Sequence, residues 1–353
     1  MSDTGPHAAI VDLRSDLLSP PSPAVVAAMQ AALAAAPEFE LRGDDHESAL
    51  ERKAAALLGK EDALFFPTCT MANLCAAMLA GRQGGLLLVP EDCHVLTSEE
   101  GGASSLAGLD VVVLRGVMTD PEQWARVLGQ DDGSRAGPAL VWLENTHNRQ
   151  GGLPLPAGRT RAIAEMARGH GARSHLDGAR LFNAAIALGV RPDAIAAGFD
   201  TVSISLNKGL GAPVGAMLAG SRDLIRQAVA VRQRLGGGMR PSATLCAPAL
   251  AALDSWPEIA RDHALAHLLW REIGEDAAIA EPATNIVMIR LAGEGAAEVL
   301  RRRLADNGVM ALCLEPQVLR LVTHRGLTEA GIRRAAALIR SILNSFRDTE
   351  TTQ

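Results

Sequence analysis

The chain has no tyrosine and only ten aromatic residues in 353 positions. Tyrosine therefore cannot serve as an acid or base in any reaction of this protein. The five cysteines are scattered and form no C-x-x-C pair, which argues against a zinc ribbon or a disulfide framework. We therefore expect a reducing, cytoplasmic location and no metal site. No apolar run reaches about 18 residues, so we expect no membrane-spanning helix.

Positive charge is not in excess, since 34 Lys and Arg stand against 40 Asp and Glu, for a net charge of −6. This balance argues against a basic surface that binds nucleic acid. Hydrophobic residues make up 48% of the chain, which excludes a disordered polymer. The first residues include acidic ones and form no apolar segment, so we expect no signal peptide.

Short apolar runs alternate with helical segments in the first part of the chain, which predicts an α/β fold with a mostly parallel sheet. The runs expected to form strands are 62–67, 85–89, 109–114, 139–143, 172–176, 201–206 and 214–219. Amphipathic segments at 121–128 and 160–169 are expected to be helices.

The pattern changes after residue 246. Three long helical stretches, 247–273, 293–307 and 328–348, enclose short strands at 285–290 and 318–322. At roughly 150 residues per domain, the length suggests two domains. We predict an N-terminal segment and large domain over 1–246 and a small α+β domain over 247–353, with a long helix as one way of joining them.

A lysine follows one of the predicted strands. Lys208 lies in Asn-Lys-Gly-Leu-Gly-Ala-Pro-Val-Gly, just past the strand at 201–206. Glycines let a backbone approach a ligand closely. A partly desolvated lysine there is able to form a Schiff base. Taken alone, an ordinary surface lysine on a loop explains the same pattern.

An aspartate follows another predicted strand. Asp177 lies in Ser-His-Leu-Asp-Gly-Ala-Arg, and 208 − 177 = 31 residues separate it from Lys208, enough for one strand–helix–strand step. In open α/β sheets, ligands bind outside the carboxyl ends of the strands. A carboxylate there can keep a pyridinium nitrogen protonated. A helix N-cap is the alternative role.

The segment Phe66-Pro-Thr-Cys-Thr70 leads from a predicted strand directly into a helix. Two hydroxyl groups and the free N–H groups of a helix start form a site for an anion such as phosphate. Capping of the helix by Thr68 or Thr70 explains the same residues without a ligand.

Together with three further motifs, these segments resemble the low-specificity L-threonine aldolases. The further motifs are Glu144-Asn-Thr-His147-Asn, Leu235-Gly-Gly-Gly-Met-Arg240 and Leu319-Arg320-Leu-Val-Thr-His324. The resemblance extends from Val11 to His324. It implies a fold-type I, PLP-dependent transferase-like architecture in the β-eliminating lyase group, with a large domain and a smaller C-terminal one.

The resemblance also implies which residues bind the cofactor, pyridoxal 5′-phosphate (PLP). Lys208 is expected to hold it covalently and Asp177 to pair with its ring nitrogen. His94 matches the histidine that stacks on the ring. The residues expected at the phosphate are Thr68, Cys69 and Thr70.

The remaining site residues follow from the same resemblance. Ser15, Arg180 and Arg320 match positions that receive the substrate carboxylate, and Arg180 also falls among the cofactor residues. A planar guanidinium suits a carboxylate because two N–H donors meet two oxygens. Arg240 maps near the cofactor, which it reaches from a neighbouring subunit, and His147 maps near the substrate hydroxyl.

Some of these residues also fit a purely structural role. Both His94 and His147 also fit as buried structural histidines, and Arg320 fits as a buried ion-pair residue in its strand. His175 fits the protein core better than it fits a catalytic role.

The resemblance implies that a β-hydroxy-α-amino acid is cleaved to glycine and an aldehyde. His94 or His147 would take the hydroxyl proton, directly or through water. The substrate is a small molecule, and a homodimer or homotetramer is expected. Alternatives are β-elimination or other α-carbon chemistry with the same cofactor, and a degenerate scaffold that binds proteins. A nicotinamide-binding fold is excluded because no G-x-G-x-x-G opens a helix after an early strand.

Several positions depart from the family pattern: Cys69 replaces the glycine of the phosphate turn, and Arg42, Ser98, Glu100 and Asn207 replace other usual residues. Because cysteine tolerates positive φ poorly, we expect a reshaped turn. We also expect a polar or bulkier substrate β-substituent that contacts Arg42 or Glu100.

Overall fold

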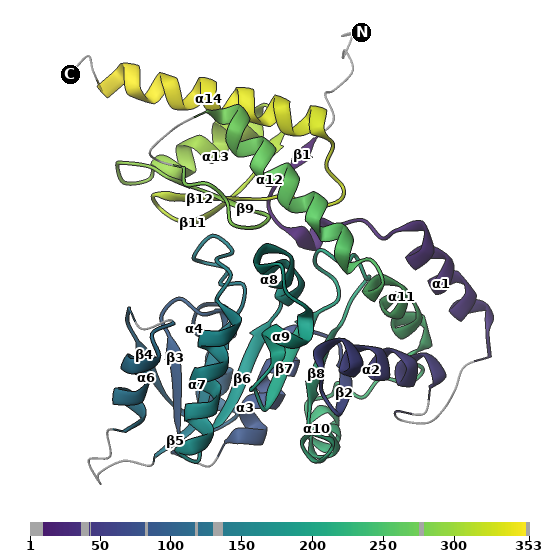
Figure 1. Ribbon diagram of the computed structural model, residues 1–353. Coiled ribbons are helices and arrows are strands. Elements are labelled where there is room, and N and C mark those ends of the chain that lie inside the picture. Colours follow the sequence, from purple (N-terminus) through teal and green to yellow (C-terminus); the bar gives the residue numbers. More distant parts are fainter. Residues whose placement is uncertain are drawn as a thin grey trace. The chain divides into compact units, whose positions relative to one another are not determined.

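Two groups of elements make up the chain in a computed structural model, shown in Figure 1. The described residues are 10–36, 42, 44–81, 84–116, 119–129, 137–274 and 279–350. The sheet unit comprises Pro21–Pro257, and the terminal unit comprises Met1–Pro20 with Glu258–Gln353.

This division differs from the predicted one in two ways: the N-terminal segment belongs with the C-terminal residues, and the C-terminal part of that unit begins at Glu258 instead of at residue 247. Strand β1 (Val11–Asp12) pairs in parallel with β10 (Val309–Met310). The carbonyl oxygen of Leu13 accepts a hydrogen bond of 2.8 Å from the N–H of Val322. Backbone pairing between segments about 300 residues apart in sequence therefore places Val11–Leu13 in the terminal unit.

The sheet unit contains a seven-stranded sheet with the order β2-β8-β7-β6-β5-β3-β4. Its strands are β2 (Asp62–Phe66), β3 (Leu86–Pro90), β4 (Asp110–Leu114), β5 (Pro138–Glu144), β6 (Arg173–Gly178), β7 (Thr201–Ser205) and β8 (Ala216–Gly220). Only β8 runs against the other six. All seven predicted strand segments are thus confirmed, as is the mostly parallel sheet.

Helices surround this sheet. They are α1 (Pro23–Ala34), α2 (Asp45–Leu58), α3 (Cys69–Ala80), α4 (His94–Thr97), α5 (Gly102–Ser105), α6 (Pro121–Leu128), α7 (Ala157–Gly169), α8 (Leu181–Leu188), α9 (Pro192–Ala196), α10 (Arg222–Arg234) and α11 (Ala243–Leu253). Figure 1 shows α7 in front of the strands and α3 behind them. The predicted helices at 121–128 and 160–169 correspond to α6 and α7.

Alternation along the strands explains how the core forms. Successive strand side chains point to opposite faces, so Leu64 and Phe66 of β2 point the same way. Both join a buried cluster with Ala72 of α3 and Ile225 of α10. Strand β7, which lies between β6 and β8 in the interior of the sheet, is buried along its whole length, as expected for a strand covered on both faces.

The terminal unit combines a three-stranded antiparallel sheet with long helices. Besides β1 and β10 it contains the 3-10 turn η1 (Asp16–Leu18), α12 (Ile259–Ile273), β9 (Ile286–Arg290), α13 (Ala296–Asp306), β11 (Leu312–Glu315), β12 (Val318–Val322) and α14 (Glu329–Glu350). The sheet order is β11-β12-β9. Apolar residues of α12, α13 and α14 form one core with β9 and β12.

The single long helix predicted over 247–273 is wrong. Helix α11 ends at Leu253, a short 3-10 turn covers Trp256–Glu258, and α12 begins at Ile259. Pro257 explains the break, because proline has no N–H for a helical hydrogen bond and disfavours a helical residue before it.

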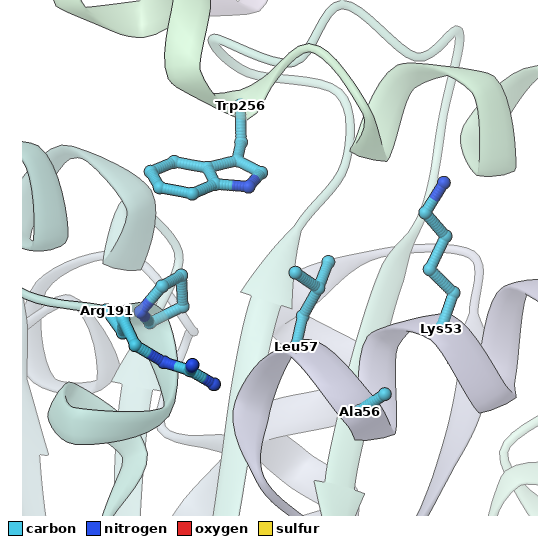
Figure 2. A pocket seen from close by; sticks show the side chains of 6 residues that line it. Lys53, Ala56, Leu57, Arg191 and Trp256 are labelled. Atoms are coloured by element: carbon cyan, nitrogen blue, oxygen red, sulfur yellow. The ribbon is translucent and has the colours of Figure 1, made fainter.

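Among the described residues, no helix combines the length and the apolar character needed to cross a bilayer. The sheet unit has a hollow of about 410 Å³ lined by Lys53, Ala56, Leu57, Arg191, Pro192 and Trp256. In Figure 2, Trp256 lies on one side of it, and Leu57 and Lys53 project from α2 on the other. The Lys53 ammonium pairs with Asp254, and the Arg191 guanidinium pairs with Asp193.

Candidate active site

The carboxyl ends of three neighbouring strands meet at one edge of the sheet. β5, β6 and β7 are parallel and in register, with Glu144 beside Asp177 and Asp177 beside Ser203. Lys208 follows β7 by three residues. Parallel strands present their carboxyl ends at the same edge, which is where ligands bind in such folds. The predicted lysine and aspartate therefore belong to one edge.

Lys208 is half-buried in a tight loop. Its carbonyl oxygen accepts a hydrogen bond of 2.9 Å from the N–H of Gly211. Gly211 has a φ of 75°, a left-handed conformation that glycine adopts without strain. The glycines of this motif thus shape the loop that presents the lysine.

Asp177 is 1% exposed, and both of its oxygens are hydrogen-bonded. Oδ1 accepts from the Ala179 N–H at 3.0 Å, and Oδ2 accepts from the Asn73 amide at 2.8 Å. The carboxylate therefore stabilises the turn that follows β6, the structural role considered from sequence. The bond to Asn73 additionally orients it from a helix far away in sequence.

Helix α3 begins at the same edge. Thr68 is its N-cap, and its hydroxyl accepts from the Met71 N–H at 3.1 Å. Thr68 and Thr70 are exposed. The first turn thus offers two hydroxyl groups and helix-terminal N–H groups to an anion.

Cys69 is the first residue of α3, and it does not adopt positive φ. The cysteine is therefore accommodated without a left-handed backbone, and the reshaping of the turn relative to the family stays a prediction. Burial raises the pKa of the Cys69 thiol, and the negative charge of Asp177 raises it further, against the opposing charge of Lys208. These two charged groups therefore lie around the thiol.

His94 opens α4, and two carboxylates hold it. The backbone N–H of His94 donates to Glu144 Oε2 at 2.5 Å, and the ring Nδ1 lies 2.8 Å from Glu99 Oε1. Burial lowers the pKa of His94, but the hydrogen bond to Glu99 and the charges of Asp177, Glu99 and Glu144 outweigh it, so the pKa is raised above its ordinary value. The side chain stays 33% exposed and is accessible to a ligand.

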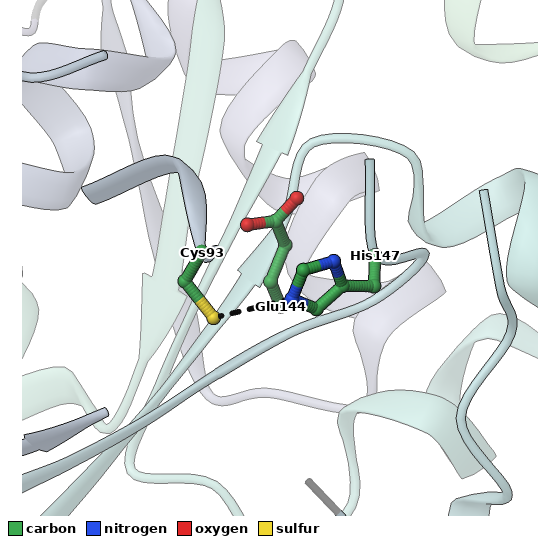
Figure 3. Close-up of side chains that lie close together, drawn as sticks. All are labelled: Cys93, Glu144 and His147. Carbon is green, nitrogen blue, oxygen red and sulfur yellow. Dashed lines mark hydrogen bonds between the residues drawn. The ribbon is translucent and has the colours of Figure 1, made fainter. Parts of the chain in front are cut away.

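His147 lies in a buried cluster with Cys93 and Glu144, drawn in Figure 3. Its Nε2 lies 3.6 Å from the Cys93 sulfur, and its Nδ1 has no partner among the described residues. The imidazole is fully buried. The two predicted histidines thus differ in access, since His94 reaches the surface and His147 does not.

Arg180 and Arg240 belong to the sheet unit as well. Arg180 precedes α8, is 7% exposed, and donates to Asn148 Oδ1 at 3.0 Å. Arg240 is exposed, after three glycines. A Cβ on Gly237 would lie 2.4 Å from the Met71 sulfur, so a larger residue there would require the flexible Met71 side chain to move.

Ser15 and Arg320 lie in the terminal unit. The Ser15 hydroxyl accepts from the Leu17 N–H at 3.2 Å. Arg320 lies on β12, is 6% exposed, and donates to the Arg14 carbonyl oxygen at 3.3 Å. Their binding of a substrate carboxylate stays a prediction.

The family model for beta-eliminating lyases matches residues 12–294. The chain belongs to the beta-eliminating lyase family. It is 35% identical over 356 residues to low-specificity L-threonine aldolase 1 of Arabidopsis thaliana, with 97% of this chain and 99% of that protein covered.

Two solved structures share the fold of the present chain. Threonine aldolase of Leishmania major superimposes with a TM-score of 0.81 at 21% identity, covering 94% of this chain and 99% of that chain. A structure of SPT with PLP gives a TM-score of 0.75 at 18% identity, covering 94% of this chain and 87% of that chain. The predicted fold-type I architecture is confirmed.

The edge residues of this lyase-family chain fit PLP. The half-buried amine of Lys208 suits the aldehyde of the cofactor, and the buried carboxylate of Asp177 suits its pyridine nitrogen. The N-terminus of α3 suits its phosphate. The fit rests on the chemistry of these donors at one edge of the sheet. PLP is the cofactor of this chain.

Two buried residues of the site, Asn73 and Glu99, were not predicted. Asn73 lies on α3, whose sequence is otherwise almost entirely apolar. A buried amide in an apolar helix needs hydrogen-bond partners. An asparagine in so apolar a helix was therefore the sequence feature that could have indicated a buried polar contact. Glu99 had no comparable signal, since it is one of two adjacent glutamates in a polar stretch.

The expectation that Arg42 contacts the substrate is wrong within this chain. Its guanidinium donates to Glu51 Oε2 and to Asp62 Oδ1, each at 2.8 Å. Asp62 begins β2 and is paired with Gly220 of β8. Gly220 is in turn paired with Thr201, the first residue of β7. Arg42 is thus bound at the edge opposite to the one that Lys208 follows, about 13 Å away along the strand.

The contact of Glu100 with the substrate stays a prediction. Glu100 and Ser98 are exposed. Asn207 accepts a hydrogen bond of 2.9 Å from the Ser205 hydroxyl, which ties the residue before the lysine to the end of β7.

Proposed function

We propose that this protein is a PLP-dependent aldolase that cleaves L-threonine-like β-hydroxy-α-amino acids to glycine and an aldehyde. One observation carries the proposal: a half-buried lysine, a buried aspartate and a hydroxyl-rich helix start converge on one edge of the sheet in a beta-eliminating lyase. The name of the 35% identical Arabidopsis relative supports the aldol reaction.

Each residue at the edge has a definite task. Lys208 would hold the cofactor covalently, and Asp177 would keep its ring nitrogen protonated. Thr68, Cys69 and Thr70 would hold the phosphate. When bound, PLP supplies an electron sink for the electrons of a bond broken at the substrate α-carbon. Arg240 is assigned near the cofactor of a neighbouring subunit on the resemblance alone.

Substrate positioning decides which bond breaks. We assign the substrate carboxylate to Arg180, whose guanidinium is preorganised by Asn148. Ser15 and Arg320 are assigned to the same carboxylate on the resemblance alone. The hydroxyl proton is assigned to His94 or His147. Access favours His94, whereas the unpartnered ring nitrogen of His147 favours His147.

Product analysis tests the reaction. The full-length chain with PLP is incubated with L-threonine, L-allo-threonine and phenylserine, and glycine release is measured. Glycine with an aldehyde supports aldol cleavage, whereas a keto acid with ammonia overturns it in favour of β-elimination. No turnover across the panel, despite bound PLP, also overturns it.

A labelling experiment tests the covalent attachment separately. Borohydride reduction followed by peptide mapping is expected to place the reduced cofactor on Lys208. Lys208→Ala should abolish the label and the activity. A label on Lys60 or Lys53 in the wild-type chain, or no label at all, overturns the assignment.

A homo-oligomer, dimer or tetramer, is part of the proposal. Only Val25 and Ala32 of the twelve residues of α1 are buried, although the helix has no charged residue and only one polar one, Gln30. Val26 and Leu33 are 41% and 64% exposed. An apolar helix of this kind is typical of a surface that a second copy covers. The double variant Val26→Glu with Leu33→Glu should shift the molar mass from light scattering towards the monomer.

A cytoplasmic location completes the proposal. All five cysteines are free thiols. This suits a reducing compartment. Cell fractionation of the tagged chain tests it, and recovery only in an oxidising compartment or in membranes would contradict it.

A further inference from the structure

The amide of Asn73 joins two buried carboxylates. Its Nδ2 donates to Glu99 Oε1 and to Asp177 Oδ2, each at 2.8 Å. Asn73 and Asp177 are each 1% exposed, and Glu99 is 8% exposed. The amide therefore uses both of its N–H groups on carboxylates from other elements of the sheet unit.

The carbonyl side of the same amide is also fully used. Asn73 Oδ1 accepts from the Ser203 hydroxyl at 2.6 Å and from His175 Nε2 at 3.2 Å. His175 Nδ1 in turn lies 2.8 Å from the Thr201 hydroxyl. Burial lowers the pKa of His175 to about 4, so its ring is neutral with one donor and one acceptor. A flipped Asn73 amide would place its oxygen against two carboxylates, so only one orientation is satisfied.

The electrostatics of the two carboxylates require such a bridge. Burial raises the pKa of Glu99, and the nearby charge of Asp177 raises it further, while the hydrogen bonds from His94 and Asn73 lower it. Two buried like charges repel, and a shared donor offsets this repulsion. Losing the donor therefore favours proton uptake by Glu99.

We propose that Asn73 is a positioning residue that holds Glu99 and Asp177 together, and through them sets the two groups assigned to the cofactor ring. The connection runs from His94 through Glu99 and Asn73 to Asp177, with hydrogen bonds of 2.8 Å at each step. This inference rests on the proposed function, because that function assigns His94 and Asp177 to PLP. The amide itself touches neither substrate nor cofactor in the proposal.

Histidine NMR on the full-length chain, with and without PLP, tests the bridge. The resonance of His94 is assigned with His94→Gln and followed against pH in Asn73→Leu, a variant of similar volume. We expect the pKa of His94 to fall by about one unit, because a protonated Glu99 no longer stabilises the imidazolium. Asp177 and Glu144 also face His94 and are present in both proteins.

Ser203→Ala is the matched control, since it removes a partner of the same buried amide, and the Ser203 hydroxyl has no hydrogen bond to either carboxylate among the described contacts. It should leave the His94 titration in place. An unchanged His94 titration in folded Asn73→Leu, or an equal shift in Ser203→Ala, overturns the proposal. If Asn73→Leu does not fold, Asn73→Ser keeps one short donor and should give a smaller shift in the same direction; no shift in that variant also overturns it.

PLP affinity provides the second measurement. We expect Asn73→Leu to weaken PLP binding about tenfold, since a misplaced Asp177 loses a charge-assisted contact of about 1.4 kcal/mol. The two hypotheses fail separately. Turnover in the wild-type chain without a His94 shift in Asn73→Leu rejects the positioning role alone. A His94 shift in a chain that cleaves no substrate rejects the proposed function alone.

Discussion

The ring Nδ1 of His94 lies 2.8 Å from Oε1 of Glu99, so a carboxylate holds the imidazole that opens α4. Burial alone would lower the pKa of His94, yet this hydrogen bond and the surrounding negative charges raise it. A histidine with a raised pKa stabilises the folded chain fully below its unfolded pKa of about 6.5, and this contribution disappears as the pH rises through the folded pKa.

This relationship predicts a pH-dependent cost for losing the histidine. His94→Gln should lower the free energy of unfolding by about 1 kcal/mol more at about pH 6 than at about pH 9. Urea unfolding at both pH values measures the difference. In a Glu99→Gln background the difference should shrink, and an equal difference there would show that Glu99 is not the responsible partner.

The second prediction concerns Cys69. Because this residue starts α3 with a helical backbone, Cys69→Gly should still bind PLP, at a cost of about 0.5–1 kcal/mol in stability. The absorbance of the bound cofactor and the thermal midpoint measure both effects. Cys69→Ser, which keeps a donor towards Ser203, serves as the control. Colourless Cys69→Gly protein beside coloured Cys69→Ser protein would contradict the prediction.

A third prediction separates structure from specificity at Arg42. Removing its guanidinium leaves Glu51, which is 4% exposed, without its cation, so Arg42→Ala should lower stability by about 1–3 kcal/mol. Relative rates across a panel of β-hydroxy amino acids should not change, since Arg42 is bound at the other edge of the sheet.

Arg161→Ala is the control for Arg42. Its ion pair with Glu165 is 59% and 50% exposed, and exposed pairs contribute at most about 1 kcal/mol. A changed substrate preference in Arg42→Ala, with Arg161→Ala unaffected, would restore the specificity role that the sequence suggested.

The fourth prediction concerns a buried acid in the terminal unit. Burial raises the pKa of Asp262 to about 7, and the charge of Asp16 contributes. Neither Asp262 oxygen accepts a hydrogen bond among the described residues, although the charges of Arg325 and Arg261 partly offset the effect of burial. Between its unfolded pKa near 4 and about pH 7, the folded chain binds more protons than the unfolded chain, so this group destabilises the fold increasingly as the pH rises.

Asp262→Asn should therefore raise the free energy of unfolding, relative to the wild type, by on the order of 2 kcal/mol more at about pH 8 than at about pH 4. Urea unfolding at the two pH values measures this. Asp306→Asn, at an exposed position on α13, is the control. An equal gain at Asp306, or no gain at Asp262, would contradict the prediction.

Local patterns predicted much of the site. The strand preceding Asp177, the strand preceding Lys208 and the helix starting after Thr68 each form from residues that are neighbours in sequence. Parallel pairing then brings the strand ends together, as predicted. The helix break at Pro257 was not predicted, because the residues on both sides share one helical pattern. Proline itself indicates such a break, since it cannot donate a helical hydrogen bond.

The sequence by itself determined the family, the cofactor and the residues of the sheet edge, because short motifs encode strand ends, glycine turns and helix starts. Only the tertiary structure decided what lies behind them. The Asn73–Asp177 bond joins residues 104 positions apart, Arg42 reaches Asp62 over 20 positions, and Leu13 pairs with Val322. Such partners are chosen by burial and by the need of every buried polar group for a hydrogen bond, which no local pattern specifies.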